Sequence, residues 1–265
     1  MTTQTVRAVE RAIDVLDVIK ISGGAAGVSE ISQEVGLAKS TVHRILVALS
    51  NKGVVHKDGD TDLYLFGHKV IEFAFAASQY KDIVSLVIPY LEELRDRLGE
   101  TAALALKVGL KYIYVAQVPS LREHRVNPVL GIQYPLHWAG TGKAILAFVS
   151  DAELEKCLGV VPFLRSTART VADPAVLLEQ LKETRRVGYS ISFSERSEGA
   201  AAIASPIRDR RGLAQAAICI VGPELRFRQM DPGAMGKVVA EVSCRVEMAC
   251  QASGLEIATS PTRQE

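Results

Sequence analysis

The chain has 265 residues, 48% of them hydrophobic, with 31 Lys and Arg against 30 Asp and Glu. This length can hold more than one domain, but no run approaches the roughly 20 apolar residues of a membrane span. The N-terminus has no apolar signal segment, so we expect a cytoplasmic protein, and a net charge of +1 neither favours nor excludes nucleic acid.

An opening helix is predicted over residues 6–21. Its apolar positions form two adjacent stripes: Val6, Val9, Ile13 and Leu16, with Ala12, Val15 and Ile19 beside them. So wide a face covers more than one neighbour. We expect it to pack on the following module and to take part in a dimer contact, with a purely internal role as the alternative. The Gly-rich residues 23–27 then end the helix.

Residues 29–55 indicate two short amphipathic helices with a turn at Gly36. The apolar positions are Val28, Ile31 and Val35 in the first helix, and Val42, Ile45, Leu46 and Leu49 in the second. Glycine adopts a left-handed conformation without the steric penalty that a Cβ brings, so it suits the end of the first helix. The pattern predicts a helix-turn-helix.

The other face of the second helix predicts a DNA-binding surface. It presents Lys39, Ser40, Thr41, His43 and Arg44, and residues 35–57 include four basic residues and no acidic one. Amides at the start of the helix, around Ser40 and Thr41, add donors for a phosphate or a base edge. The alternative is an ordinary helical hairpin with a solvated polar face.

A β-hairpin is predicted next, with strands at 53–57 and 63–66 around the acidic turn 58–62. It adds a wing, for which we expect a packing role, since an acidic tip suits phosphate poorly. We place a winged helix-turn-helix DNA-binding domain at 1–66 and a linker helix at 67–81. A further helix should run from Asp82 to Leu98, with Pro89 bending it or marking its true start.

From residue 100 the pattern changes to that of an α+β domain. Strands are predicted at 101–108, 111–118, 189–193, 200–207 and 213–221, and helices at 143–148, 151–158, 174–187 and 232–252. Ser150 with Glu153 is a capping box, and Asp173 with Pro174 opens a helix that Gly188 ends. This domain spans 82–252, and 253–265 should be a flexible tail.

Cysteine and histidine spacing gives no sign of catalysis. Cys157, Cys219, Cys244 and Cys250 form no CxxC pair and no Cys/His cluster, so we expect small buried thiols and no zinc site. The histidines lack HExxH spacing and the chain lacks a Gly-rich phosphate loop. We therefore predict no catalytic residue, no metal and no cofactor.

The chain resembles the IclR family of bacterial transcriptional regulators from Val6 to about Ala252. The matching pieces, in order, are Arg11-Ala12 with Val15-Leu16, Glu30-Ile31, GLAKSTVHRIL, Phe66-Gly67, Pro89-Tyr90-Leu91, PLHWAGTGKAILA, GYSISFSE, GAAAIASPI and VGP. The resemblance implies an N-terminal winged helix-turn-helix joined by a helical linker to a GAF-like mixed α/β effector-binding domain. It also implies a homodimer, or a dimer of dimers (a homotetramer), on an operator.

The resemblance also implies an effector site at Gly140, Ser192, Ala202, Cys219 and Val221. This chain departs from the family at four of these five positions, so the polar groups that hold glyoxylate or pyruvate are largely missing. With Trp138 and Leu130 nearby, such a site predicts an aromatic or similarly hydrophobic acid. Arg122 or Arg125 would pair with its charge; the alternatives are a core role for Trp138 and a solvated loop for the arginines.

We therefore expect a regulator, activator or repressor, of a catabolic operon. It would bind a palindromic DNA operator, and its effector would change how two winged modules sit on the DNA. One alternative is a GAF-type cysteine redox enzyme. Such an enzyme needs an activated thiolate, and none of the four cysteines has neighbours in the sequence that would activate it. The other is a ligand-binding module without DNA binding, which DNA footprinting distinguishes.

Overall fold

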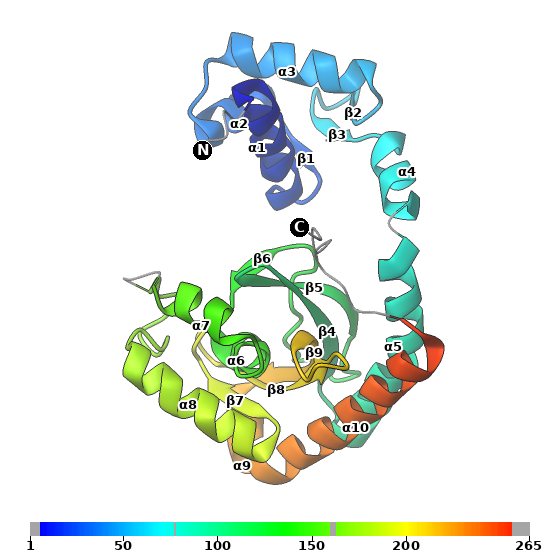
Figure 1. Cartoon of the computed structure of the whole chain (residues 1–265). Coiled ribbons are helices and arrows are strands. Elements are labelled where there is room, and N and C mark those ends of the chain that lie inside the picture. Colours follow the sequence, from blue (N-terminus) through cyan, green and yellow to red (C-terminus); the bar gives the residue numbers. More distant parts are fainter. Residues whose placement is uncertain (1–5, 77, 160–162, 256–265) are drawn as a thin grey trace. The chain divides into compact units, whose positions relative to one another are not determined.

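The computed structural model divides the chain into two compact units, Met1–Ser78 and Gln79–Glu265 (Figure 1). The structure describes residues 6–76, 78–159 and 163–255. The predicted flexible tail falls outside the described residues beyond position 255. Within the described ranges, no helix combines the length and the apolar character needed to cross a membrane.

The first unit is a small helical domain with a three-stranded sheet. In chain order it holds α1 (Arg7–Ile21), β1 (Ala25–Ala26), α2 (Val28–Val35), α3 (Lys39–Asn51), β2 (Val55–Lys57), β3 (Tyr64–Phe66) and α4 (His68–Ala76). The sheet order is β1-β3-β2, with antiparallel neighbours. The hairpin of β2 and β3 confirms the wing. Strand β1 was not predicted, because the glycines around its two alanines indicated only the end of a helix.

Helix α1 buries one of the two predicted apolar stripes. Val15, Val18 and Ile19 are buried, whereas Val9 and Ile13 on the other stripe are 60% and 53% exposed. Both stripes are apolar, so their spacing alone cannot decide which faces the core. The buried side joins α2, α3 and the sheet in one apolar cluster.

The second unit begins within α5 (Ser78–Leu98). This helix starts four residues earlier than predicted, and Pro89 lies inside it rather than at its start. The unit continues with β4 (Thr101–Val108), β5 (Lys111–Val118), β6 (Gln133–Pro135), α6 (Ala139–Leu146), α7 (Asp151–Leu158), α8 (Pro174–Val187), β7 (Ser190–Phe193), β8 (Ala200–Arg208), β9 (Ala214–Pro223), α9 (Glu224–Gln229) and α10 (Pro232–Ser253).

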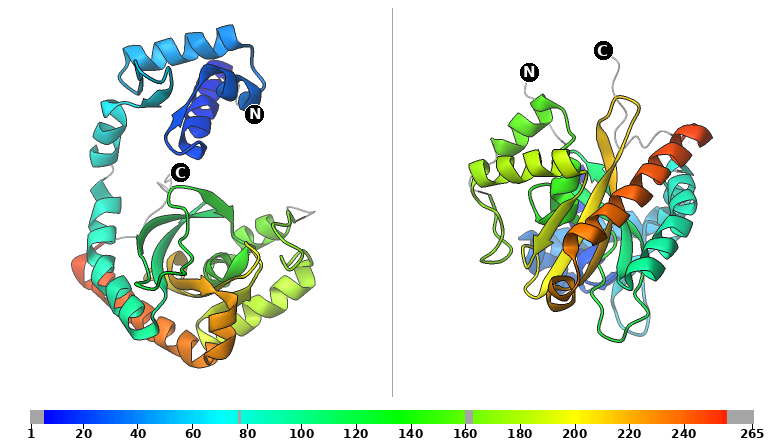
Figure 2. Two further views of the ribbon diagram at one scale, coloured as in Figure 1. Left: turned by 180° about the vertical axis from the view of Figure 1, so that it is seen from behind. Right: turned by 90° about the horizontal axis from the view of Figure 1, so that it is seen from below.

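The six strands form one sheet between two layers of helices. Their order is β6-β5-β4-β9-β8-β7, and the neighbouring strands are antiparallel. Figure 2 shows α5 and α10 on one face of the sheet and α6, α7 and α8 on the other. Alternate side chains along β4 serve the two faces: Leu104 packs with α5 and α10, and Ala103 packs with α6. This arrangement confirms the α+β prediction.

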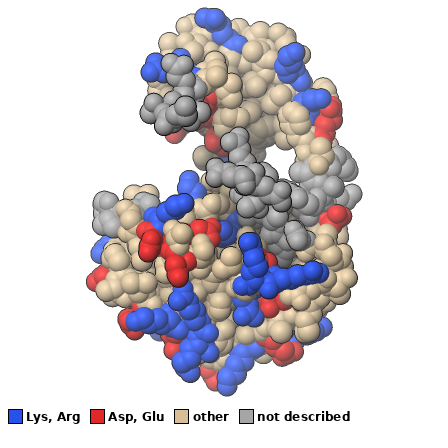
Figure 3. Space-filling view, in the orientation of Figure 1, with Lys and Arg blue, Asp and Glu red and all other residues tan. Residues whose placement is uncertain are grey.

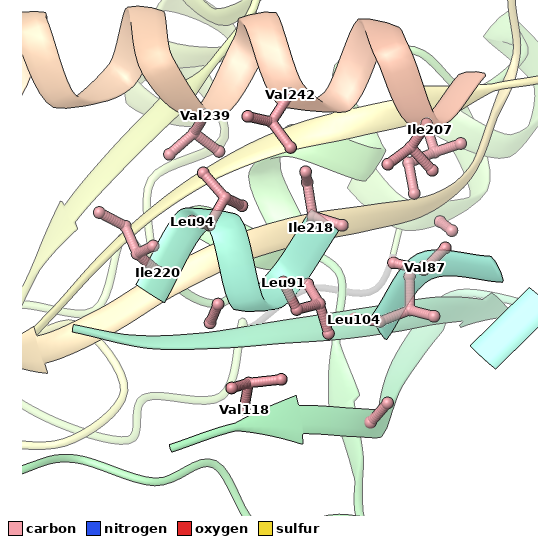
Figure 4. Close-up of a cluster of buried hydrophobic side chains, with 14 of the residues drawn as sticks. Val87, Leu91, Leu94, Leu104, Val118, Ile207, Ile218, Ile220, Val239 and Val242 are labelled. Atoms are coloured by element: carbon pink, nitrogen blue, oxygen red, sulfur yellow. The ribbon is translucent and has the colours of Figure 1, made fainter. Parts of the chain in front are cut away.

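The α5–α10 face carries an aliphatic core (Figure 4). Leu91 and Leu94 of α5 meet Val239 and Val242 of α10 over Ile218 of β9, and all five are fully buried. Fully burying a side chain of this size contributes about 1.5–3 kcal/mol. The core therefore anchors α5, the helix in which the two units join.

Helix α6 begins four residues before its predicted start at Lys143. A Cβ on Gly142 would lie 2.4 Å from the Leu136 carbonyl oxygen, and one on Gly140 would lie 2.9 Å from the Ala202 carbonyl oxygen. Backbone therefore packs directly on this first turn, and glycine is needed despite its weak helix propensity. The helix α9 was also missed. The predicted Ser150–Glu153 capping box and the Asp173 cap are both confirmed.

Candidate functional sites

The turn between α2 and α3 fixes the angle at which α3 leaves. Gly36 ends α2 with φ +65°, the left-handed conformation predicted for it. The Ser32 hydroxyl donates to the Leu37 carbonyl at 2.6 Å, and the Leu37 amide donates back to the Ser32 carbonyl at 3.2 Å. The start of α3 is thus held by hydrogen bonds on both sides of one turn.

Helix α3 has one buried face and one open polar face. Val42 and Leu46 are fully buried. Lys39, Ser40, His43 and Arg44 are exposed and Thr41 is half-buried. The structure thus brings the five predicted DNA-binding residues together on and around the open side of one helix. Figure 3 shows Lys and Arg atoms along the edge of the first unit that α3 forms.

The cations of this face are not neutralised within the first unit. Its ion pairs are Lys20 with Asp17, Lys57 with Asp62, and Lys69 with Glu72. Within residues 6–76 none of them includes Lys39 or Arg44. Lys57 is different, because its Nζ lies 2.5 Å from the Asp62 carboxylate. Of the four basic residues counted in 35–57, Lys57 is therefore neutralised by a neighbouring carboxylate.

The helix N-terminus is a smaller donor site than expected. The Thr41 amide donates to the Ala38 carbonyl at 2.9 Å, so it is not a free donor. Ala38 provides no side-chain cap. The donors that the sequence placed around Ser40 and Thr41 are accordingly confined to the residues before Thr41.

The tip of the wing uses its acidic groups internally. The Asp58 carboxylate accepts hydrogen bonds from the hydroxyl and the amide of Thr61, and the Thr61 hydroxyl lowers the pKa of Asp58. Tyr64 and Val55 behind it are buried. These contacts agree with the packing role expected of the wing.

The second unit contains a hollow beside the start of α6. Its empty space is about 300 Å³, mouth included, and its lining is Tyr114, Val126, Ala139, Ser192, Glu195, Arg196, Ser197, Ala200, Ala201, Ala202 and Val221. Three of the predicted effector residues, Ser192, Ala202 and Val221, are on this lining. Ligand sites typically have mostly apolar walls and a few polar groups, and this lining has that composition.

The other predicted effector residues lie around the hollow or away from it. Gly140 is directly behind the wall, where its amide donates to the Ser192 hydroxyl at 2.8 Å. Cys219 is fully buried in the sheet. Trp138 donates its indole N–H to the Leu164 carbonyl at 2.8 Å, and Leu130 is 44% exposed. Neither Trp138 nor Leu130 is on the lining, although the sequence suggested both as neighbours.

The charged partners suggested for an acid are also elsewhere. Arg122 lies 3.2 Å from the buried Glu100 carboxylate, which Arg226 also holds with two hydrogen bonds of 2.6 and 2.7 Å. The exposed Arg125 donates to the Arg122 carbonyl at 3.3 Å. Neither guanidinium is on the lining of the hollow, so the proximity inferred from the sequence is corrected.

A buried ion pair supports one side of the hollow. Lys143 Nζ lies 2.6 Å from Glu195 Oε1 and 2.8 Å from Gln180 Oε1, and the Lys143 and Glu195 side chains are 1% and 9% exposed. Burial raises the pKa of Glu195 and lowers that of Lys143, because removing a charge from water disfavours it. Their mutual attraction opposes both shifts. The Glu195 carboxylate is therefore engaged by Lys143.

Sequence reasoning missed Arg196 and the tyrosines beneath it. The Arg196 guanidinium lies 4.9 Å from the centre of the Tyr134 ring and 5.5 Å from that of Tyr114. Tyr112 and Tyr114 alternate along β5 on one face, and that spacing could have indicated an aromatic wall. Nothing near Arg196 in the sequence indicates its partners, which are 62 or more positions away.

The cysteines differ in part from expectation. Cys157, Cys219 and Cys250 are buried, and burial raises the pKa of each thiol. Such thiols stay protonated near neutral pH and are poor nucleophiles. Cys244 is exposed, where a buried residue was predicted, because it lies on the outer side of α10.

Two family models together match most of the chain. The model described as the IclR helix-turn-helix domain matches residues 8–59, and the model described as bacterial transcriptional regulator IclR C-terminal matches residues 75–247. Named relatives include the HTH-type transcriptional regulator BhcR of Paracoccus denitrificans, 35% identical over 90% of this chain and 85% of that protein. The HTH-type transcriptional repressor AllR of Escherichia coli is 30% identical over 89% of this chain and 88% of its own length.

Solved structures show the same fold. The Thermotoga maritima IclR structure is 28% identical and covers 91% of this chain and 99% of its own, with a TM-score of 0.68. An IclR homologue from Microbacterium hydrocarbonoxydans, complexed with 4-hydroxybenzoate, has a TM-score of 0.80 at 23% identity and covers 92% of this chain and 99% of its own. At that identity the second likeness concerns the fold alone.

Proposed function

The chain belongs to the IclR family of bacterial transcriptional regulators, and from that premise we propose that it binds operator DNA through α3 and responds to a small-molecule effector held in the hollow of its second unit. It would act in the cytoplasm, where the operator lies, and control a catabolic operon. The named relatives are regulators or repressors of transcription rather than enzymes.

The open face of α3 is the observation that carries the DNA-binding role. Lys39 and Arg44 have no carboxylate partner within residues 6–76 and lie beside the exposed Ser40 and His43. Cations and short donors on one exposed helix suit phosphates and base edges. We assign Lys39, Ser40, Thr41, His43 and Arg44 to this contact.

The composition of the hollow supports an effector that is both apolar and acidic. Ala139, Ala202 and Val221 give it hydrocarbon walls, while Ser192 and Arg196 give it polar groups. An aromatic or similarly hydrophobic acid fits such a lining. Its hydrocarbon part would displace water from the apolar walls, and the polar groups would bind its carboxylate. The Microbacterium homologue that binds 4-hydroxybenzoate gives an example of such an acid on this fold.

Exposed apolar residues on and just before α1 support a symmetric assembly. Val6, Val9 and Ile13 are 65%, 60% and 53% exposed, and a second copy that covers them would remove this hydrocarbon from water. A homodimer, or a dimer of dimers, would bind a palindromic operator, since two-fold symmetry in the protein is matched by two-fold symmetry in the DNA.

Selection from random duplex DNA tests this proposal. The full-length protein is incubated with a library of random duplexes, and bound sequences are recovered and amplified over several rounds. We expect enrichment of a palindrome whose half-sites are about 10 base pairs apart, or a multiple of that spacing. Recovery of no common sequence would refute DNA recognition. Recovery of one isolated half-site would refute the symmetric assembly alone.

A further inference from the structure

Three hydroxyl groups hold the turn that carries Arg196. The carbonyls of residues 194, 195 and 196 accept hydrogen bonds of 2.6 Å from Thr167, Thr170 and Ser166 respectively. The turn therefore has its shape before any ligand binds. A side chain that leaves such a fixed backbone is pre-positioned, and little order is lost when it binds something.

The Arg196 side chain is half-buried, and its charged guanidinium is incompletely bonded. Its Nη1 atom is buried and has no hydrogen-bond partner among the described residues. The Tyr134 and Tyr114 rings lie against it at 4.9 and 5.5 Å, but ring contacts engage the face of a guanidinium and leave its N–H edge unsatisfied. A buried charged donor without an acceptor is strongly unfavourable.

No acidic residue in the described part of the chain forms an ion pair with Arg196. The adjacent Glu195 is the obvious candidate, but its Oε1 lies 2.6 Å from Lys143 Nζ. Its Oε2 is buried and has no hydrogen-bond partner among the described residues, Arg196 included. Arg196 also lines the hollow, together with Ser192 and Ala139. A positive group with an open N–H edge on the lining of a hollow suits an anion from outside the chain.

We propose that Arg196 binds the carboxylate of the effector, a small planar monocarboxylic acid whose hydrocarbon part lies against Ala202 and Val221. This inference rests on the proposed effector role of the hollow, and it assigns the charge partner to Arg196 in place of Arg122 or Arg125.

Matched acids and amides test the assignment by isothermal titration of the full-length protein. Benzoate, phenylacetate and pyruvate are each compared with benzamide, phenylacetamide and pyruvamide, which have nearly the same shape and no charge. We expect at least one acid to bind about tenfold or more tightly than its amide. If no acid of the three binds more tightly than its amide, the proposal is overturned.

Two substitutions then identify the residue responsible. Arg196→Met should remove the preference for the acid, while Arg122→Met should keep it, because Glu100 still has Arg226 as a partner. A preference that survives Arg196→Met overturns the proposal. If the Met variant does not fold, Arg196→Lys decides: the acid should lose at least about threefold in affinity and the amide nothing, since Lys lacks the planar fork. An Arg196→Lys variant that binds the acid with unchanged affinity would also overturn the proposal.

These titrations contain no DNA, so they separate this inference from the regulatory role. Loss of acid preference with intact DNA selection would refute the Arg196 assignment alone. Failure of DNA selection with intact acid preference would refute the regulator and leave an acid-binding site.

Discussion

Glu224, the first residue of α9, links this helix to the turn that carries Arg196. Its carboxylate accepts hydrogen bonds from the Ser194 hydroxyl, from Arg228 at 2.7 Å and from Arg169 at 2.8 Å, and these contacts lower its pKa to about 2. The Glu224 amide also donates to the Gly199 carbonyl at 2.7 Å. The Glu224 side chain thus connects α9, the turn that carries Arg196 and the segment that holds Arg169.

Stability should fall in acid partly because of this group. The folded-state pKa of Glu224 is below the ordinary value of 4.5, so the unfolded chain binds the proton more tightly. The stabilisation is therefore present above about pH 4.5 and is lost as the pH falls towards about 2. We expect the melting temperature of the wild type to fall more steeply through this window than that of Glu224→Gln, which has no carboxylate to protonate.

Thermal unfolding followed by circular dichroism between pH 7 and pH 2.5 measures the difference. Glu179→Gln is the control, because Glu179 lies in an exposed ion pair with Lys182 and should follow the wild-type curve. Parallel curves for wild type and Glu224→Gln would show that Glu224 is not held as the structure has it.

At the scale of elements, two glycines have different reasons to be glycine. Gly36 needs only its left-handed conformation, since a Cβ there meets nothing within 4 Å. Gly67, directly after β3, is buried against backbone: a Cβ would lie 2.2 Å from the Gly53 carbonyl oxygen. That oxygen also accepts the Lys69 amide at 3.0 Å, which closes the wing onto α4.

Alanine at these two positions should therefore have unequal effects. We expect Gly67→Ala to destabilise the first unit by about 2–3 kcal/mol, since it forces backbone apart. Gly36→Ala should cost about 1 kcal/mol, the penalty of a left-handed alanine. Amide hydrogen exchange of peptides within residues 28–66 reports both, with a larger loss of protection for Gly67→Ala. Equal losses would contradict the close approach of Gly67 to Gly53.

Elements with a clear period and a chemical start or stop could be predicted from the sequence. Helix α8 is an example: Asp173 caps it and Gly188 ends it in the left-handed conformation, as their residue types indicate. The start of α6 could not be predicted, because two glycines weaken its helical pattern locally. Glycine is needed at both positions because the backbone of Leu136 and Ala202 packs against them. That contact is tertiary, so the local sequence does not reveal it.

The candidate sites divide in the same way. The face of α3 is local, so residue spacing correctly placed Lys39, Ser40, His43 and Arg44 on one open surface. The hollow is built from distant segments, and the partners of Arg196 lie on β5 and β6. Positional matching to the family indicated Ser192, Ala202 and Val221, which line the hollow. Residue types alone could not distinguish Arg196 from a solvated arginine.

At the scale of the whole molecule, regulation requires that the two units be coupled. An effector changes DNA binding only if it binds the DNA-competent and DNA-incompetent arrangements with unequal affinity. The chain between the units runs through α4 and into α5, whose inner face is anchored on the sheet by Leu91 and Leu94. Any effect of the effector on the first unit would have to pass through these two helices, which lie between the units in the chain.

The central claim is that α3 reads DNA with Arg44 and its neighbours. Its most direct test is the salt dependence of binding to the selected duplex, measured by fluorescence anisotropy for wild type, Arg44→Ala and the control Arg186→Ala on α8. If Arg44 contacts a phosphate, its loss should weaken binding about tenfold and reduce the slope of log affinity against log salt by about one, since about one counterion is released per contact. Arg186→Ala should match the wild type. An Arg44→Ala variant with unchanged affinity and unchanged slope would contradict the account.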